Sequence, residues 1–540
     1  MVKDQNKNIA KSDENQGKAG VASGASKIGP STKFETISER LSPFGGLLGL
    51  VKFMDLVKFK EIFDGLYIAP SRKPVLGHYN MVYGLLILLF IGFNRVWHFL
   101  FIQFDSMICS IFDVVKLPYV TTYWRYVNSL GINQGKAFLL IMSALRERVW
   151  HLCDIEYETI HIDIDPTTTT VYGNQQGSRK CYNPRHRGKK GFRQVLCFIA
   201  ETREYIFGKF RSGKTLSGEE SSQLILELKK HIPRCVKNVI LRADSEITCW
   251  ESVKAAEKEE YQFIFSNDKC KPVFEDSSWY KIRKNDEVEY NECMYQPTGW
   301  KKPHRFLIMR IPIEEPKTDG PIQLELLDVP KYKCRIFVTN LTKKPHKCIS
   351  EYDKRADCEN SIGEAQREGI SAIPSRKFAN NYACFQMVML SYNIWRSFKM
   401  LAGQGLMEEK SEAQADSQSK GKSFSKAIVD NTIRIARLKL LIIAAKVANS
   451  KNTTKVKYSE HDRRTENLFK FYEYLDKLRN KARPWLDSQR WCSKHLQSLN
   501  VEQFAFSWIY SCKKFLAPFS AMSLKQISLH FEKDIFLKMT

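Results

Sequence analysis

The hydrophobic pattern of the chain changes its period at Thr159, and this change constrains the fold more than any other feature of the sequence. From Thr159 to Asp165 apolar and polar residues alternate, which is typical of a β-strand with two different faces. The isoleucines lie on one face, whereas His161, Asp163 and Asp165 lie on the other. Because Pro166 follows directly, the acids stand near a strand end, where side chains are placed to project into a cleft.

The residues before this strand are patterned as helices. Residues 1–33 are rich in Lys, Asn, Gly and Ser, so we expect a disordered arm. Residues 34–155 form a predicted helical region whose scattered basic residues suit DNA binding, with a plain helical bundle as the alternative. Its predicted helices are Leu48–Phe63, Tyr79–Phe104, Asp105–Leu117, Thr121–Leu130 and Gln134–Trp150. The apolar run Val82–Phe93 is shorter than the roughly 20 residues of a membrane span, so we expect a buried helix and no membrane partner.

The residues after the strand predict an α/β core that is interrupted by an insertion. The first part of the core covers 156–267, with a hairpin of Val195–Ala200 and Tyr205–Phe210. Strand-like segments separated by Pro, Gly and Asn predict a mostly β insertion over 268–350: Val288–Tyr295, Phe306–Ile313, Ile322–Leu327 and Cys334–Val338. The core resumes over 351–402, a flexible linker follows over 403–424, and a helical C-terminal region with a basic helix at Thr432–Ala448 covers 425–540.

The charge of the chain indicates a polyanionic partner. Its net charge is +25 and its pI is about 9.4. A basic stretch without acids, Gly177–Arg193, is suited to contact a phosphate backbone, although a solvated charged loop is the alternative. Its cations are Arg179, Lys180, Arg185, Arg187, Lys189, Lys190 and Arg193. The 14 cysteines form no C-x-x-C pair, so we expect reduced thiols in a cytoplasmic protein.

A second acidic feature lies far along the chain, in the segment Glu351–Gly369. Its composition predicts one helix, with Gly369 where a C-cap would sit. On that helix Tyr352, Arg355, Glu359 and Gln366 would share one polar face, which an apolar core stripe would not. We therefore expect this face to meet something charged.

Three acids in three separate settings form the predicted catalytic set. Asp165 ends the first strand, Asp244 follows a later strand, and Glu359 lies on the helix. Clustered carboxylates repel one another and are hard to ionise, a cost that divalent cations remove. Two Mg²⁺ or Mn²⁺ ions held by such oxygens can activate an attacking oxygen and stabilise the leaving oxygen of a phosphodiester. Singly, each acid has a structural explanation as well, for example as a strand-end cap or a surface ion pair.

As an ordered set, these segments resemble a known family. The motifs are Ile162-Asp-Ile-Asp-Pro-Thr167, Tyr172-Gly-Asn-Gln175, Gly191-Phe-Arg193, Leu241-Arg-Ala-Asp-Ser245, Val338-Thr-Asn-Leu341 and Tyr352-x-x-Arg355-x-x-x-Glu359. Over residues 36 to 490 the chain resembles a bacterial insertion-sequence transposase of the DDE type, most closely the group named after insertion sequence thirteen-eighty.

The resemblance implies an RNase H-like core, transposition of DNA, and homodimers on the element's inverted-repeat ends and target DNA. It implies that Asp165, Asp244 and Glu359 ligate the metal ions, and that Tyr352 and Arg355 contact the transposon end. Asp163 is the alternative first ligand, because it points the same way as Asp165. Related enzymes stack a flipped base on a Trp of the insertion, for which Trp300 is the candidate. The family usually has Lys where this chain has Gln366.

Two other function classes compete with this hypothesis. The sequence Gly208-Lys-Phe-Arg-Ser-Gly-Lys-Thr215 matches the phosphate loop of nucleotide hydrolases. Such a loop follows a parallel strand, whereas Tyr205–Phe210 is predicted as the second arm of a hairpin. The other class is a DNA-binding protein derived from a transposase that has lost its chemistry, which Gln366 favours and the three intact acids disfavour.

Overall fold

The computed structural model describes residues 28–181, 183, 186–313, 332–408, 428–450 and 453–486. Residues 1–40 and 41–540 are two separate units, and the elements named below belong to the second. The described residues 28–40 of the first unit contain no helix or strand. Most of the predicted disordered arm lies outside the described residues.

The helical pattern before Thr159 is confirmed, with shorter helices than expected. The helices are α2 (Leu47–Leu56), α3 (Phe59–Leu66), α4 (His78–Phe90), α5 (Phe99–Ile102), α6 (Ser106–Ile111), α7 (Val120–Val127) and α8 (Ile132–Leu152). Helix α4 is buried from Met81 to Phe90, as expected for a helix that is apolar on all sides. It ends before Gly92, whose φ of +100° favours glycine. Among the described residues, no helix is long and apolar enough to cross a membrane.

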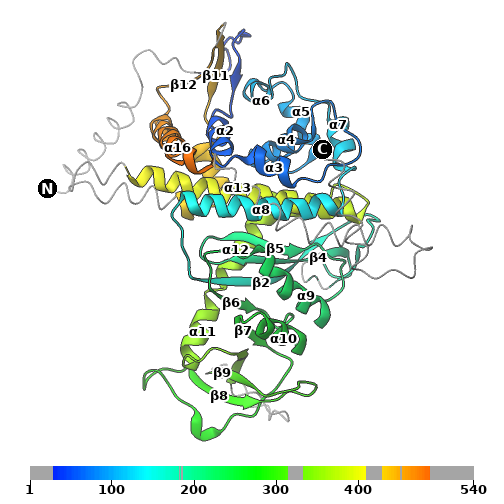
Figure 1. Cartoon of the computed structure of the whole chain (residues 1–540), viewed down its shortest axis with the longest axis vertical. Helices are drawn as coiled ribbons and strands as arrows, with labels where there is room; N and C mark the ends of the chain where they lie inside the picture. Colours follow the sequence, from blue (N-terminus) through cyan, green and yellow to red (C-terminus); the bar gives the residue numbers. More distant parts are fainter. Residues whose placement is uncertain are drawn as a thin grey trace, which may run out of the picture. The chain divides into compact units, whose positions relative to one another are not determined.

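Helices α8 and α13 (Phe378–Glu408) lie side by side between the other helices and the sheet (Figure 1). Two buried arginines of α8 reach in opposite directions. Arg146 donates to the carbonyl of Tyr205 at 2.7 Å, on the sheet side, and Arg148 donates to the carbonyl of Val57 at 2.6 Å, after α2. One hydrophobic core includes residues of both sides. Helix α8 therefore joins the helical region firmly to the sheet.

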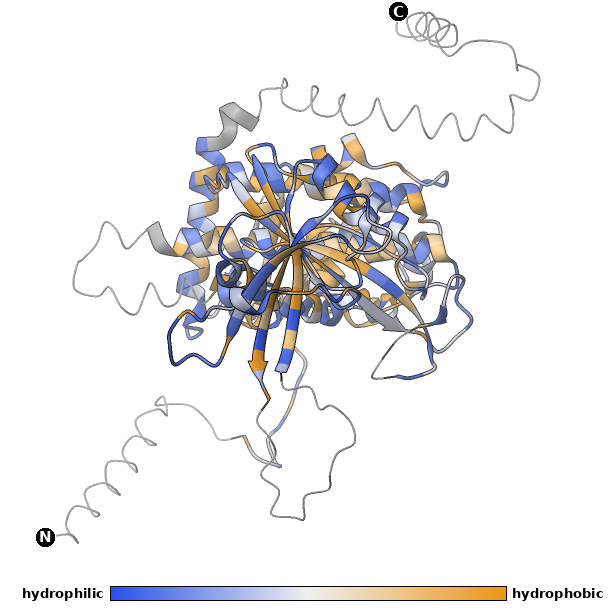
Figure 2. Ribbon diagram, turned by 90° about the horizontal axis from the view of Figure 1, so that it is seen from below, coloured by the Kyte–Doolittle hydropathy of each residue, from blue (hydrophilic) through white to orange (hydrophobic). Residues whose placement is uncertain are grey.

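The centre of the unit is a mixed sheet of nine strands among the described residues. Strand β2 (Thr159–Thr170) pairs antiparallel with β4 (Lys190–Ile199), which pairs with β5 (Glu204–Lys209). On its other side β2 pairs in parallel with β6 (Asn238–Ala243), and β6 with β7 (Gln262–Asn267). This mixed arrangement confirms the predicted α/β class, and the antiparallel pairing of β4 with β5 confirms the predicted hairpin. The strands near the middle of Figure 2 are coloured mostly as hydrophobic.

Helices α9 (Gly218–Leu228) and α10 (Trp250–Lys258) pack against each other beside this sheet.

Strand β2 continues past its predicted end, through Pro166. Proline is tolerated there because β6 pairs with β2 only as far as Ile164 opposite Ala243, so the missing N–H of Pro166 costs no hydrogen bond to β6. On the other side Pro166 stays in register with Val195 of β4.

The insertion extends the same sheet. Strand β10 (Tyr332–Thr339) pairs antiparallel with β7, β9 (His304–Pro312) pairs with β10, and β8 (Glu289–Tyr295) pairs with β9. Three of the four strand-like segments are thus strands, while Ile322–Leu327 lies outside the described residues. The insertion is therefore held by the backbone ladder of the core.

The single helix predicted over Glu351–Gly369 is wrong. The segment contains α11 (Pro345–Asp353), α12 (Ala356–Ala365) and a π-helix, η4 (Gln366–Ile370). Between α11 and α12 the N–H of Arg355 bonds to the carbonyl of Tyr352 at 2.8 Å, and the N–H of Cys358 to that of Arg355 at 2.8 Å. These bonds span three residues, which tightens the turn between α11 and α12. The four polar residues therefore lie on α11, the turn, α12 and η4 instead of on one helix.

The predicted basic helix at Thr432–Ala448 is also wrong in its second half. Helix α15 covers only Ile433–Leu440, and the chain then forms strands β11 (Ala445–Ser450) and β12 (Thr453–Tyr458) before α16 (Arg464–Leu486). Strand β11 lies between β12 and β1 (Leu41–Ser42) in a small sheet. The apolar spacing of this segment could not reveal its pairing with β1, about 400 residues earlier in the chain. The remainder of the predicted helical tail lies outside the described residues.

Candidate active site

Asp165 and Asp244 lie next to each other where the pairing of the parallel strands β2 and β6 ends. Strands β2 and β6 pair with Ile164 opposite Ala243, so the next residue along each strand is an aspartate. The side chain of Asp244 accepts a hydrogen bond from the N–H of Glu246 at 3.2 Å, in the turn that leads the chain out of the sheet. The strand register therefore brings together two acids that are far apart in the sequence.

Asp163, the alternative first acid, has a different environment from Asp165. Both its carboxylate oxygens accept hydrogen bonds from Arg242, at 2.6 and 2.9 Å, and both side chains are only 2% exposed. Arg242 also donates to the carbonyl of Glu351 in α11 at 2.7 Å. Asp163 is thus fully engaged in a buried ion pair that holds α11 against the sheet, which favours Asp165 as the acid of the site.

The charge of Glu359 reaches Asp165. Burial, together with the charges of Asp244 and Glu359, raises the pKa of Asp165 to about 7 against the opposing charge of Arg355. The pKa of Asp244 is also raised, by burial in the first place. Charges shift a pKa in this way when they lie close to the titrating group. The three predicted acids therefore belong to one electrostatic cluster.

Helix α12, which carries Glu359, packs on strands β2 and β4. Immediately after it, the side-chain amide of Gln366 donates to the hydroxyl of Thr167 at 2.8 Å. Thr167 follows Asp165 by two residues on β2. Gln366 thus links the end of α12, which carries Glu359, to β2, which carries Asp165. The sequence indicated this residue only as a departure from the family.

Arg355 is the cation of the cluster. Its Nη1 lies 3.3 Å from Oδ1 of Asp165, and this buried nitrogen has no hydrogen-bond partner among the described residues. The ring of Tyr352 is buried against Phe337, with centroids 4.8 Å apart, and Arg355 lies 5.5 Å from its centroid. Tyr352 is therefore placed to support Arg355, and its contact with a transposon end stays a prediction.

The donors at this site suit a hard divalent cation in kind, because they are carboxylates that repel one another. Their arrangement does not yet match a metal centre: among the described residues, no three or more His, Cys, Asp or Glu side chains are grouped so that they could hold a metal ion. Asp165 pairs with Arg355 instead, whose guanidinium balances part of its charge. The residue types fit such an ion, whereas their spacing in this structure does not.

A second network near the site was not predicted from the sequence. The two ring nitrogens of His161 lie 2.7 Å from carboxylate oxygens of Glu201 and Glu351. Burial opposes charging of the ring, but the two glutamates outweigh it and raise the pKa of His161. Lys343 completes the network, 2.7 Å from Glu351. The network holds α11 on β2, and only the alternation of polar residues on β2 hinted at it.

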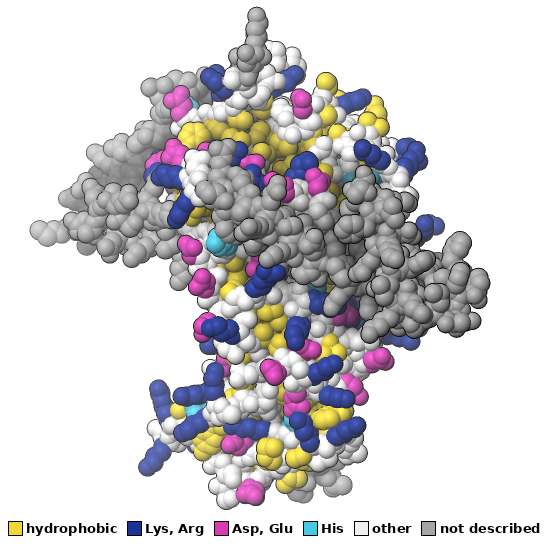
Figure 3. Space-filling model, in the orientation of Figure 1, with side chains coloured by type: hydrophobic (Ala, Val, Ile, Leu, Met, Phe, Trp, Pro, Cys, Tyr) yellow, Lys and Arg dark blue, Asp and Glu magenta, His cyan; other side chains and the backbone are white. Residues whose placement is uncertain are grey.

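The predicted DNA-binding residues other than Tyr352 and Arg355 do not join the acidic cluster. Arg179 and Lys180 form the short strand β3, which pairs with β4, and these two residues are exposed together with Arg187, Lys189 and Lys190. Arg185 lies outside the described residues. Trp300 is partly buried and packs on Trp250 and His304, with centroids 5.7 and 5.2 Å apart, so its role in base stacking stays a prediction. Figure 3 shows further Lys and Arg side chains over the part of the surface that carries β8, β9 and α11.

The phosphate-loop motif does not have the required structural context. Gly208 lies within β5, antiparallel to β4 and opposite Leu196, so the motif does not follow a parallel strand. A Cβ at Gly208 would lie 2.4 Å from the carbonyl oxygen of Val195, which explains the glycine by close strand packing. Arg211 within the motif is buried and pairs with Glu220 at 2.5 Å. The contacts of Gly208 and Arg211 therefore indicate that this motif has a structural role.

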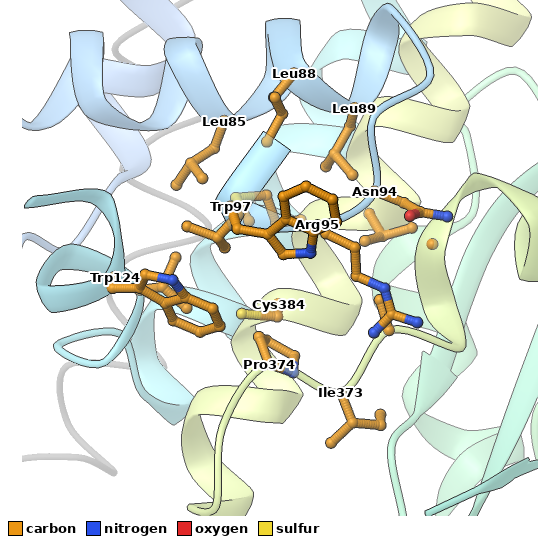
Figure 4. A pocket seen from close by; sticks show the side chains of 16 residues that line it. Leu85, Leu88, Leu89, Asn94, Arg95, Trp97, Trp124, Ile373, Pro374 and Cys384 are labelled. Carbon is orange, nitrogen blue, oxygen red and sulfur yellow. The ribbon is translucent and has the colours of Figure 1, made fainter. Parts of the chain in front are cut away.

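A cavity of about 260 Å³ lies in the helical region, apart from the acids (Figure 4). Trp97, Trp124 and Arg95 line it from one side, and Ile373 and Pro374 from the segment after η4. Its other lining residues are mostly aliphatic. None of the predicted site residues contributes to it, so the cavity is not part of the candidate active site.

Residues 38–480 match the family described as "Transposase DDE domain group 1". The chain belongs to this transposase family. Three solved structures are similar to this transposase at low sequence identity, and no curated protein matches it. A piggyBac transposase synaptic complex with hairpin DNA is 11% identical, with 79% of this chain and 85% of that chain covered and a TM-score of 0.35.

The other two structures are of the Mos1 transposase. Its paired-end complex with the left transposon end is 9% identical, and its strand transfer complex is 11% identical; each covers 36% of this chain and 60% of that chain, with a TM-score of 0.15. Family membership confirms the resemblance to DDE transposases and the RNase H-like core of this transposase, whereas the thirteen-eighty group stays a prediction. It also supports a role in DNA transposition.

Proposed function

We propose that this transposase cuts DNA at the ends of its element by metal-dependent phosphodiester hydrolysis and joins the freed 3′-hydroxyl to target DNA. The strongest support for this proposal is the register of β2 and β6, in which Asp165 and Asp244 are neighbours. The charge of Glu359 also contributes to the raised pKa of Asp165. Like charges brought together at a strand end are unfavourable for folding, which indicates a catalytic rather than a structural arrangement.

The proposed roles of the residues follow from their contacts. Asp165, Asp244 and Glu359 would hold two Mg²⁺ or Mn²⁺ ions, which, when bound, activate the attacking oxygen and stabilise the leaving one. Arg355 balances the charge of Asp165 in the metal-free protein at 3.3 Å and is free to contact a phosphate once Asp165 turns to its other partners. Gln366 and Thr167 keep the strand and the helix in register.

The proposed partners are the inverted-repeat ends and the target DNA, bound by a homodimer. The net charge of +25 favours a polyanion, and five exposed cations near β3 and β4 are placed to contact a phosphate backbone: Arg179, Lys180, Arg187, Lys189 and Lys190. A dimer places one active site at each of two ends, as closed symmetric assemblies do.

The test is cleavage of a labelled duplex that carries the element's own end, with and without Mg²⁺. Wild-type protein should nick at the end only with the metal ion, and Glu359→Gln should not, although it binds the same duplex with similar affinity. Asp357→Asn is the matched control, because Asp357 lies on the same helix as Glu359 but forms only an exposed ion pair with Arg203. Equal cleavage by wild type and Glu359→Gln would refute the proposal, and tight binding without cleavage by wild type would favour an inactive DNA-binding protein.

A further inference from the structure

Tyr172 is the most exposed aromatic side chain close to the basic strands. Its exposure is 79%, whereas the preceding Val171 is buried and its N–H bonds to the carbonyl of Lys190 at 2.9 Å. In the described part of the chain, the side chain of Tyr172 makes no hydrogen bond, ion pair or aromatic ring contact. An exposed aromatic ring that makes no such contact with the described residues is available to a partner.

The loop that follows Tyr172 is held firmly. The N–H of Gln176 bonds to the carbonyl of Arg376 at 2.8 Å, and the side chain of Gln176 accepts from the N–H of Phe378 at 3.2 Å. Gly177 has a φ of +84° and lies against the ring of Phe378, where a Cβ would come within 2.8 Å of it. These contacts fix the loop to the start of α13. Tyr172 is therefore presented on a rigid base and loses little entropy on binding.

Cations surround this position. Thr170, near the end of β2, pairs with Gly191 of β4, which in turn pairs with Arg179 of β3. The next pair of β3 and β4 consists of Lys180 and Lys190. The Nζ of Lys190 lies 3.4 Å from the side-chain oxygen of Asn174, two residues after Tyr172. An exposed aromatic ring among exposed cations matches a nucleic acid better than an apolar protein surface, because rings stack on bases and cations hold phosphates.

Strand β2 links Tyr172 directly to the candidate active site. Seven residues separate Tyr172 from Asp165, and a strand rises about 3.3 Å per residue, so the two lie up to about 23 Å apart. Stacked bases are spaced by about 3.4 Å along a strand of DNA. A duplex that follows the cations from Asp165 towards Lys190 would thus bring a base about five to seven pairs from the scissile phosphate to the ring.

We propose that Tyr172 is a DNA-contacting residue whose ring stacks on, or inserts beside, a base of the bound end at about five to seven base pairs from the cleavage position. This inference rests on the proposed function, because it needs end DNA bound at the acidic cluster. The ring sets the position of the end along β2, while the cations of β3 and β4 supply attraction that does not depend on sequence.

The test uses the full chain with Asp165→Asn, which binds but does not cut, and end duplexes with 2-aminopurine at each position from 1 to about 12. The fluorescence should change at one or two neighbouring positions within the range of about five to seven, and Tyr172→Leu should abolish that change. Tyr172→Phe keeps the ring and should retain it. Affinity at fixed salt should fall roughly 5- to 150-fold in Tyr172→Leu, the range for loss of one base–aromatic stack.

The salt dependence separates stacking from charge. Tyr172→Leu should keep the wild-type slope of log affinity against log salt, whereas the matched variant Lys180→Ala should reduce that slope by about one. Unchanged affinity and an unchanged fluorescence pattern in Tyr172→Leu would overturn the inference while wild-type cleavage leaves the proposed function intact. Loss of dimer mass without loss of the fluorescence signal would assign Tyr172 to a protein contact and also overturn it. If the wild-type protein does not bind the end duplex, both the inference on Tyr172 and the proposed function are wrong.

Discussion

Two groups of acids meet close to helix α12 and have opposite environments: the candidate catalytic acids, and the glutamates that follow Glu359 in α12 and η4. Beyond Glu359, the carboxylate of Glu364 is buried with Arg396 and also accepts the N–H of Ile433 at 2.5 Å. Glu368 is paired with Arg437, which also donates to the carbonyl of Phe90 at 2.7 Å. Each of these acids has its own arginine. At the other group, Asp165, Asp244 and Glu359 have only Arg355 in contact with Asp165 among the described ion pairs.

The difference separates structural acids from candidate catalytic ones. Glu364 and Glu368 fasten α12 and η4 to α13 and α15, and their charges are compensated. The charges of the acidic cluster are compensated only in part, so burial raises the pKa of Asp165 to about 7. Acids whose charges are compensated only in part destabilise the folded state, and they are common at ligand-binding and catalytic sites.

Neutralising the cluster should remove activity and preserve the fold. We expect Glu359→Gln to lower the rate of end cleavage by about 10³-fold or more, because residues that act as a unit lose nearly all catalysis when one is removed. The thermal unfolding midpoint should stay near that of wild type. Cleavage assays and calorimetry of the same preparation test both parts, and a fully active variant would place Glu359 with the structural acids.

Breaking a compensated pair should give the reverse result. Arg396→Met leaves Glu364 buried without its cation and should lower the free energy of unfolding by about 3–5 kcal/mol. The double variant Arg396→Met with Glu364→Leu should recover much of this loss, because no uncompensated charge remains. Urea unfolding measures both, and a loss below about 1 kcal/mol in the single variant would contradict the comparison.

Asp165 should destabilise the metal-free protein at neutral and higher pH. Its pKa is raised to about 7 in the folded state, from the ordinary 3.8 of an aspartate, so between these pH values the folded state binds more protons. Stability therefore falls as pH rises from about 4 to 7 and stays reduced above that range. We expect Asp165→Asn to be more stable than wild type by about 1–3 kcal/mol at pH 8 with a chelator, and no more stable at pH 4.

The matched control for that measurement is Asp163→Asn on the same strand. This change breaks the buried pair with Arg242 and should destabilise the protein at pH 8. If both variants shift stability in the same direction, the contrast between the two aspartates does not hold.

The smallest effect is expected at the link between the strand and the helix. Gln366→Ala removes the hydrogen bond to Thr167 and should cost about 0.5–1.5 kcal/mol of stability. Cleavage should fall a few-fold as Glu359 loses its fixed distance from Asp165. A double-mutant cycle with Thr167→Val measures the coupling, and additive effects would mean that the bond contributes nothing to the site.

Much of the core was predictable because its signals are local. The alternation at Thr159–Asp165 predicted β2, and the hairpin of β4 and β5 followed from two short apolar runs. The buried helix α4 followed from its apolar composition. The break between α11 and α12 was not predictable, because Lys354 and Arg355 are good helix formers and nothing in their composition marks a tightened turn.

By itself, the sequence determined which residue types are present, which segments alternate or repeat with a helical period, and that the chain carries an excess of positive charge. It also carried the ordered motifs that indicate the family. Which of the two aspartates on β2 forms a buried ion pair through both of its oxygens depends on the tertiary structure. The pairing of β2 with β6 brings Arg242, 79 residues away in the chain, to Asp163. Long-range register and burial set the environment of a charge, and neither is encoded in any short stretch of the chain.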